Sequence, residues 1–226
     1  MFEPFAAGAF WSPLSRLGEA QILLPAMLVS ALWLAFRPRG LRPALIWLLA
    51  TGLAASITTA SKIAFLGFGI GSAAWDFTGI SGHAMFAAAV LPPLLLLASG
   101  PLGGKGRRWL LLAAYALAAA VAVSRVMVDA HSWSEVVSGM ALGSAASAVA
   151  LSRRRWPALR LARWAPLLML GWALLAVAGA PPSRTHDMVT RWSLALSDRP
   201  QPYHRAQMHS EYRRKAAACT SSGLLC

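Results

Sequence analysis

Long apolar segments separated by short polar breaks constrain this chain more than any other feature. Its 226 residues are 57% hydrophobic and 13% charged, which is about half the charged fraction of an ordinary soluble domain. A helix of roughly 20 apolar residues crosses the hydrocarbon core of a bilayer. We therefore predict an all-α, polytopic membrane protein built as a six-transmembrane-helix bundle. The six candidate spans lie at about 20–36, 43–61, 83–99, 109–123, 136–151 and 164–180.

The chain divides into three parts by composition. Residues 1–19 are expected to form an interfacial segment, and 20–180 the six-helix membrane domain. Residues 181–226 form a basic tail, which we expect to be disordered or only loosely attached from about 197 onwards. Its two cysteines, Cys219 and Cys226, could pair in an oxidising compartment or remain inert. The fifth span is rich in Gly, Ala and Ser, which is typical of a helix that packs against other helices rather than lipid.

The distribution of basic residues predicts the orientation of the spans. The net charge is +13, but the basic residues lie between the spans rather than on one soluble face, which argues against nucleic acid as a partner. The odd connections contain most of them, including Arg37, Arg39, Arg42, Lys105, Arg107, Arg108, Arg153, Arg154 and Arg155. By the positive-inside rule the odd connections are cytoplasmic. The even connections, at about 62–82 and 124–135, then face the outside, or the periplasm of a Gram-negative cell.

The second of these even connections contains three residues suited to phosphoryl chemistry. Glu135 follows His131 by four positions, so the two share a face if a helix begins here. A carboxylate fixes the tautomer of an imidazole and directs its other nitrogen at a reacting centre. Arg125 offers a planar fork that matches phosphate oxygens. Taken singly, Arg125 is more often an interfacial side chain, and His131 a surface or packing residue.

The first even connection contains the complementary groups. Ser81, Gly82 and His83 immediately precede an apolar span, where free backbone N–H groups at a helix N-terminus attract anions. His83 would lie beside a bound phosphate, where it can protonate a leaving oxygen. Lys62, at the end of the second span, is a candidate phosphate ligand. The plainer alternatives are that Ser81 only caps the helix and that Lys62 only reaches the interface. No spacing resembles a metal site, so we predict catalysis with neither metal nor cofactor.

These residues resemble the type-2 phosphatidic acid phosphatase superfamily, membrane lipid phosphatases related to the vanadium haloperoxidases. The family motifs are Lys-x6-Arg-Pro, Pro-Ser-Gly-His and Ser-Arg-x5-His-x3-Asp. The third appears here as Ser124-Arg125, five residues, His131, three residues and Glu135. The second appears as Ile80-Ser81-Gly82-His83. The resemblance covers roughly 60–150, and its six-helix core agrees with the hydropathy pattern.

Three departures from the family pattern matter. Ile80 replaces the proline of the second motif, and Glu135 replaces the aspartate of the third. In the first motif Lys62 is present, but Gly69 and Ile70 stand where Arg-Pro is expected. One phosphate-binding guanidinium is therefore missing, which bears on rate and substrate more than on the class of reaction.

The resemblance implies a mechanism as well as a fold. His131 attacks phosphorus and forms a phosphohistidine while Glu135 holds its ring. His83 protonates the leaving group and then activates water. The non-bridging oxygens are bound by the remaining groups, which are Lys62, Arg125, Ser81 and the backbone of Gly82.

The implied substrate is a lipid phosphate or pyrophosphate, such as undecaprenyl pyrophosphate, phosphatidylglycerol phosphate, phosphatidic acid or a lipid A phosphate. A multi-pass protein of the bacterial inner membrane would act on it at the periplasmic side. Two alternatives stay open at this stage. One is a lipid phosphotransferase, and the other is a non-catalytic lipid-phosphate binder or transporter.

Overall fold

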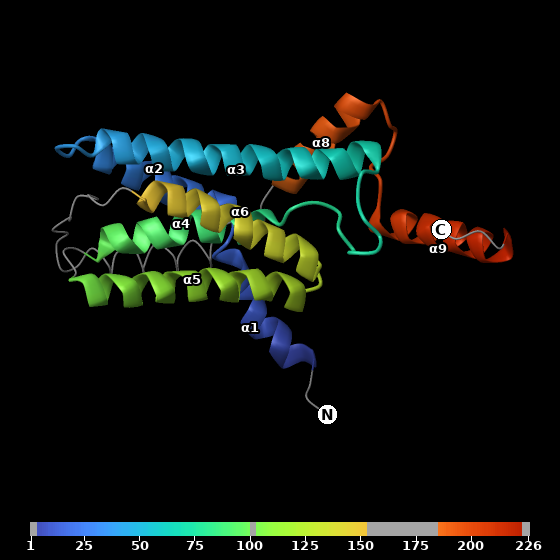
Figure 1. Cartoon of the computed structure of the whole chain (residues 1–226), viewed down its shortest axis with the longest axis horizontal. Coiled ribbons are helices and arrows are strands. Elements are labelled where there is room, and N and C mark those ends of the chain that lie inside the picture. The colour runs from blue at the N-terminus through green and yellow to red at the C-terminus, as the bar shows by residue number, and fades with distance from the viewer. Residues whose placement is uncertain (1–3, 100–102, 153–184, 223–226) are drawn as a thin grey trace.

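The structure is a computed structural model that describes residues 4–99, 103–152 and 185–222. Within these ranges the helices are joined by turns and loops, and an isolated bridge pairs Ser72 with Phe77. The helices form an elongated bundle with two further helices at one end (Figure 1). They are α1 (Pro4–Arg16), α2 (Ala20–Ala35), α3 (Leu41–Phe68), α4 (Gly82–Ala98), α5 (Gly104–Met127), α6 (Trp133–Leu151), α8 (Thr185–Ser197) and α9 (Arg205–Ser222).

The all-α membrane fold predicted from the sequence is confirmed. Among the described residues, four helical stretches are long and apolar enough to cross a bilayer, at Phe10–Ala35, Leu41–Phe68, Gly104–Met127 and Trp133–Leu151. Helix α4 is apolar but shorter. These five correspond to the first five predicted spans. The sixth predicted span, 164–180, and Cys226 lie outside the described residues.

Helix α4 is the centre of the bundle. It packs against α2, α3, α5 and α6, and its side chains from Ala84 to Val90 are buried except that of Phe86. Trp47 of α3 is also fully buried, and its indole N–H donates to the carbonyl of Ala89 at 3.1 Å. This apolar contact surface fixes the axial position of α4, and with it the position of the residues at its N-terminus.

Small residues bring α6 unusually close to α4. A Cβ atom added at Gly139 would lie 2.5 Å from the carbonyl oxygen of Ser81, and one at Gly143 would lie 2.2 Å from that of Met85. Contacts below about 3 Å are not tolerated by packed atoms, so only glycine permits this approach. The small-residue pattern of the fifth span therefore reflects helix packing, as the sequence predicts.

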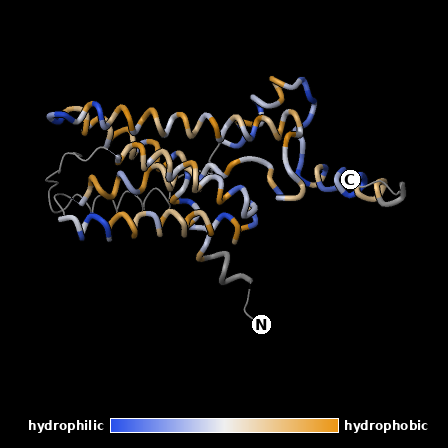
Figure 2. The backbone as a smooth tube through the Cα atoms, viewed as in Figure 1, coloured by the Kyte–Doolittle hydropathy of each residue, from blue (hydrophilic) through white to orange (hydrophobic). Residues whose placement is uncertain are grey.

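The two ends of the bundle differ in character. The connection after α2, the C-terminal end of α4 and the start of α5 lie at one end, whereas the connections after α3 and α5 lie at the other, together with α8 and α9 (Figure 1). Apolar residues line the length of the bundle and polar ones gather toward its ends (Figure 2). The chain thus places both even connections on one side, as the sequence analysis requires.

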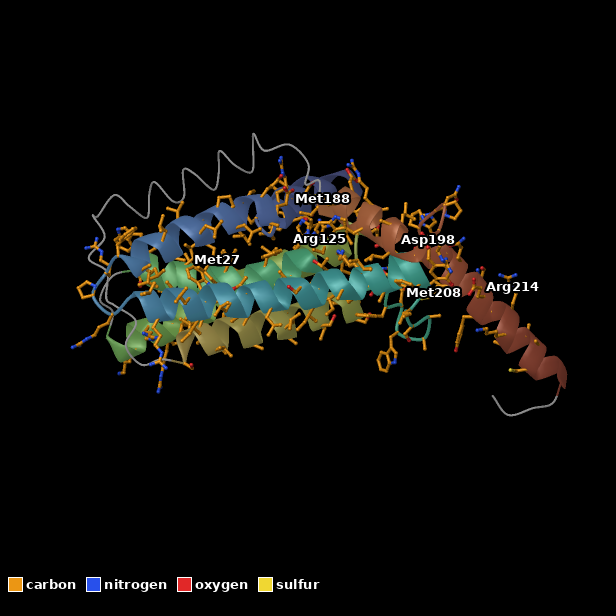
Figure 3. The ribbon with its side chains drawn as sticks, turned by 90° about the horizontal axis from the view of Figure 1, so that it is seen from above. Met27, Arg125, Met188, Asp198, Met208 and Arg214 are labelled. Carbon is orange, nitrogen blue, oxygen red and sulfur yellow. The ribbon has the colours of Figure 1, made fainter. Side chains whose placement is uncertain are left out.

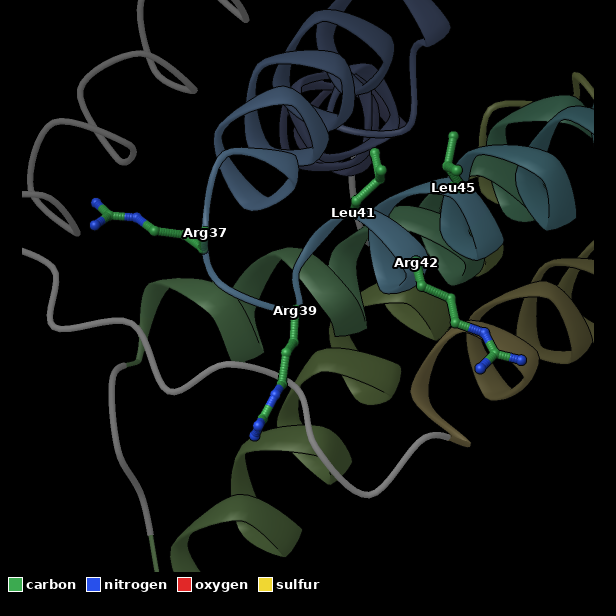
Figure 4. A pocket seen from close by; sticks show the side chains of 5 residues that line it. All are labelled: Arg37, Arg39, Leu41, Arg42 and Leu45. Atoms are coloured by element: carbon green, nitrogen blue, oxygen red, sulfur yellow. The ribbon is translucent and has the colours of Figure 1, made fainter.

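The first connection forms a shallow hollow lined by Arg37, Arg39 and Arg42 with Leu41 and Leu45. The three guanidinium groups point in different directions (Figure 4), and that of Arg37 stacks 4.7 Å from the ring centroid of Trp33. Arginines that diverge in this way do not surround a common ligand. They are typical of positive charge at a membrane surface.

The tail differs from the expectation of loose attachment. Residues 185–197 and 205–222 are helical, and Tyr203 and Met208 are buried against Phe65 of α3. The Tyr203 N–H donates to the carbonyl of Leu66 at 2.8 Å. A few anchoring side chains therefore attach a segment whose average composition is polar.

The glycine contact generates a stability prediction. Gly143→Ala should destabilise the bundle by about 1–3 kcal/mol, because the new methyl group meets the rigid backbone of α4. Gly52→Ala is the matched control, since a Cβ there has nothing within 4 Å. Thermal unfolding in detergent measures both variants. Equal midpoints for the two would contradict the close approach of α4 and α6.

Candidate active site

A cavity of about 460 Å³ opens at the end of the bundle that carries the even connections. Five of the residues predicted from the sequence line it: Lys62, Gly82, His83, Arg125 and His131. They come from the C-terminal part of α3, the N-terminus of α4, the C-terminal turn of α5 and the connection to α6. Figure 3 shows Arg125 near Met188 of α8, which lines the same cavity. The structure thus brings both predicted histidines to one space.

Behind this cavity, His131 is paired with Glu135. The imidazole Nδ1 lies 2.6 Å from Glu135 Oε2, and the Glu135 side chain is fully buried. Glu135 also accepts backbone N–H groups, as an ionised carboxylate does, so Nδ1 must supply the proton in this bond. The neutral imidazole then carries its lone pair on Nε2. This nitrogen is therefore available as a nucleophile.

Glu135 is held by local helix chemistry. Ser132 is the N-cap of α6 and forms a capping box with Glu135. The Ser132 N–H donates to Glu135 Oε2 at 3.3 Å, and the Glu135 N–H donates to Ser132 Oγ at 3.5 Å. Such a box satisfies donors that a helix start leaves free. It also explains why His131, just outside the helix, sits above the carboxylate.

The same glutamate fixes the turn that precedes His83. Its Oε1 accepts the Thr78 N–H at 2.8 Å and also the Thr78 hydroxyl. Its backbone carbonyl accepts the Ser81 N–H at 3.0 Å, while Ile80 donates to Ser61 Oγ of α3 at 3.0 Å. Because α4 starts at Gly82, these bonds set where His83 lies. One residue therefore couples the two histidine-bearing segments.

Two cations face the cavity. Arg125 donates to the hydroxyl of Ser15 in α1, and its buried Nε has no hydrogen-bond partner among the described residues. The stem of Lys62 packs beside Gly79, whose added Cβ would lie 3.1 Å from Lys62 Cγ. Gly82 borders open space, with only a Thr58 methyl 3.9 Å from an added Cβ. The cavity thus offers positive charge and an accessible helix start to an anion.

Ser81 occupies a different place from the other predicted ligands. It is the N-cap of α4 but its side chain makes no capping bond. The hydroxyl is fully buried, has no partner among the described residues, and does not line the cavity. Its role as a phosphate ligand stays a prediction, whereas its backbone clearly joins α4 to Glu135.

Burial lowers the pKa of His131 from its ordinary value of 6.5, because desolvation disfavours the charged ring. The hydrogen bond and charge of Glu135 oppose this effect, and the nearby charges of Lys62 and Arg125 add to it. The net direction keeps the imidazole neutral at neutral pH. A neutral ring is the form that can attack an electrophile.

Sequence reasoning missed a second set of polar residues beside Glu135. Thr78 binds its carboxylate, and Arg205 of α9 donates to its Oε1 at 2.7 Å. Arg205 also donates to Asp76 Oδ2 at 2.7 Å, and His209 Nε2 lies 2.7 Å from Asp76 Oδ1. The available signal was the i, i+4 spacing of Arg205 and His209, which places both on one helix face.

Comparison with known proteins agrees with this geometry. The model of the PAP2 superfamily matches residues 20–158. A protein from Klebsiella pneumoniae, described as an uncharacterized 22.5 kDa protein in the cps region, is 33% identical over 205 residues. The match covers 89% of this chain and 98% of that protein. No solved structure matches significantly.

The His131–Glu135 pair generates a titration prediction. We expect His131 to titrate below 6.5, and Glu135→Gln to lower its pKa further, because the carboxylate charge that favours the imidazolium is removed. NMR titration of histidine-labelled protein in detergent measures both values, with His131→Ala to assign the resonance. A rise of the pKa in Glu135→Gln would contradict the pairing.

Proposed function

The chain belongs to the PAP2 superfamily, and on this basis we propose that it hydrolyses a lipid phosphate or pyrophosphate through a phosphohistidine intermediate. One observation carries the proposal: His83 and His131 line the same cavity, and the Nδ1 of His131 is bonded to a buried carboxylate. That arrangement supplies a nucleophile and a separate acid–base group to one phosphorus atom.

In the first step His131 Nε2 attacks phosphorus. The P–N bond forms as the P–O bond to the leaving group breaks, and His83 donates a proton to the departing oxygen. The negative charge of the bound phosphate favours the protonated form of His83 needed for this transfer. Glu135 stabilises the positive charge that develops on the His131 ring, as a carboxylate does beside a catalytic histidine.

In the second step water replaces the enzyme at phosphorus. His83, now neutral, accepts a proton from the attacking water as the new P–O bond forms. The P–N bond breaks, and its electron pair returns to His131 Nε2. Inorganic phosphate leaves, and both histidines regain their starting protonation states.

The positive groups of the cavity stabilise the charge on the non-bridging oxygens. Lys62 and Arg125 line the cavity, and the N-terminus of α4 opens at Gly82. Preorganised cations and N–H donors are the main requirement for phosphoryl transfer. Because these side chains supply the charge that a metal would otherwise bring, we propose that the reaction is metal-independent.

The cavity is amphiphilic, which supports a lipid substrate. Beside the polar groups it is lined by apolar side chains, including Leu24, Phe86, Met188 and Trp192. Met188 and Trp192 belong to α8 and are about half exposed. A phosphate at the histidines would leave its acyl or prenyl chain against this apolar wall. We place this end of the bundle at the outer, periplasmic face of the inner membrane, because the arginine-rich connection lies at the opposite end.

A phosphate-release assay tests the proposal most simply. Purified protein should release inorganic phosphate from at least one member of a panel of undecaprenyl pyrophosphate, phosphatidylglycerol phosphate, phosphatidic acid and lipid A phosphates. His131→Ala should lower release by at least about 10³-fold while the protein stays folded in detergent. Turnover that persists in this variant would exclude His131 as the nucleophile.

The same assay separates the two alternatives. A phosphotransferase would need a second lipid acceptor and would release no free phosphate when the lipid phosphate is the sole substrate. A binder or transporter would release none under any condition.

The apolar wall generates a prediction about specificity. Trp192→Ala should raise KM for a lipid phosphate by about 3- to 10-fold, because it removes part of the surface that covers the chain. KM for a soluble aryl phosphate should be unchanged. Leu196→Ala is the matched control, since Leu196 is an exposed residue of the same helix that does not line the cavity. Equal effects on both substrates would contradict the assignment of α8 to chain binding.

A further inference from the structure

The C-terminal tail reaches the catalytic pair from outside the region that matches the family. That match ends at residue 158, whereas the tail returns to α3 at Tyr203. This side chain is buried, its ring packs edge-on to Phe65 at 5.4 Å between centroids, and its backbone N–H donates to Leu66 at 2.8 Å. The Tyr203 hydroxyl donates to Glu211 of α9 at 2.9 Å, which ties the anchor to the helix that follows.

The anchor packs beside Gly69, the residue that stands where the first family motif has its arginine. Gly69 ends α3 with φ +72°, and a Cβ added there would lie 3.6 Å from atoms of the Tyr203 ring. A left-handed backbone disfavours any residue with a side chain, and the ring fills the adjoining space. The tail therefore replaces a local side chain at this edge of the site.

Two residues beyond the anchor, Arg205 reaches Glu135. Its Nη2 donates to Glu135 Oε1 at 2.7 Å, and its Nη1 donates to Asp76 Oδ2 at 2.7 Å. Asp76 is also held by His209 at 2.7 Å. The guanidinium thus joins two carboxylates in a fixed fork, which a flexible ammonium group cannot reproduce.

The contact between Arg205 and Glu135 compensates a buried negative charge. Glu135 is fully buried, and a buried carboxylate is costly unless a cation and hydrogen-bond donors compensate it. Lys62 and Arg125 face the cavity, where the phosphate binds in the proposed mechanism. Arg205 approaches from the opposite oxygen, Oε1, and leaves Oε2 to His131. It can therefore balance Glu135 without competing for substrate.

We propose that Arg205 is a positioning residue for phosphoryl transfer, which holds the Glu135 carboxylate ionised and oriented toward His131. The C-terminal tail then contributes a residue to the active site. This inference rests on the proposed phosphatase function. It assigns Arg205 no contact with substrate.

The experiment compares Arg205→Ala, Arg205→Lys and Arg213→Ala in the full-length protein in detergent. Arg213 is an exposed arginine of the same helix and controls for loss of charge on α9. For Arg205→Ala we expect kcat to fall about 10- to 100-fold with KM changed less than about twofold. Arg205→Lys should retain an intermediate kcat, and millimolar guanidinium should restore part of the activity of Arg205→Ala. Arg213→Ala should behave as wild type.

A second measurement does not depend on turnover. Removing the positive charge of Arg205 leaves the Glu135 charge less compensated, so the pKa of His131 should rise in Arg205→Ala relative to wild type. NMR titration of His131 measures this shift. A merely structural anchor would leave both this pKa and kcat where they are in wild type.

The outcomes distinguish the two proposals. Suppose that wild type releases phosphate, and that Arg205→Ala has the same kcat and the same His131 pKa as wild type. This result would overturn the role of Arg205 and leave the phosphatase function intact. Absence of phosphate release from wild type would contradict the proposed function, and the His131 titration would still decide whether Arg205 acts on the catalytic pair. If Arg205→Ala unfolds, Arg205→Lys still tests the orienting role, because it removes the two-pronged contact with Glu135 and Asp76, and a wild-type kcat in this variant would overturn the proposal.

Discussion

The buried carboxylate of Glu135 is the interaction on which the rest of the site depends. A charge buried away from water must be compensated by hydrogen-bond donors or opposite charges of neighbouring residues. Here these residues come from separate parts of the chain. Oε2 binds the His131 ring, whereas Oε1 binds Thr78 and Arg205. The same residue's carbonyl holds Ser81 at the start of α4. His131, the turn before His83 and the tail therefore all contact one residue through its side chain or backbone.

The bundle makes this convergence possible. Glycines of α6 let it approach the backbone of α4 closely, so the N-termini of the two helices lie side by side. The first turn of α4, which carries His83, and the connection before α6, which carries His131, thus line one cavity. Function here depends on helix packing about one turn below the chemistry, in the membrane-spanning part of the protein.

Much of this arrangement was predictable from the sequence, for physical reasons. Apolar length identifies spans because a bilayer has a fixed thickness, and alternating basic connections identify the two sides. With both histidines in connections of the same side, their meeting in one cavity follows from topology. The i, i+4 spacing of His131 and Glu135 likewise predicts a bond that the structure contains.

The remaining features could not be predicted because they depend on contacts between distant residues. Arg205 and Glu135 are 70 positions apart, and no periodicity in the sequence connects them. The tail was expected to be disordered or only loosely attached, whereas Tyr203 and Met208 pack against Phe65 of α3, a contact that polar mean composition does not reveal. Ser81 was assigned from its place in a motif, but its hydroxyl is buried and does not line the cavity, while its backbone N–H donates to the carbonyl of Glu135.

The central claim is that phosphorus is attacked twice, first by His131 and then by water. Each in-line displacement inverts the configuration at phosphorus, so two in succession restore it. The stereochemical course of hydrolysis tests this claim most directly, with a substrate made chiral by oxygen isotopes and sulfur at the transferred phosphorus. The account predicts net retention. Net inversion would show a single direct attack by water and would contradict the role of His131.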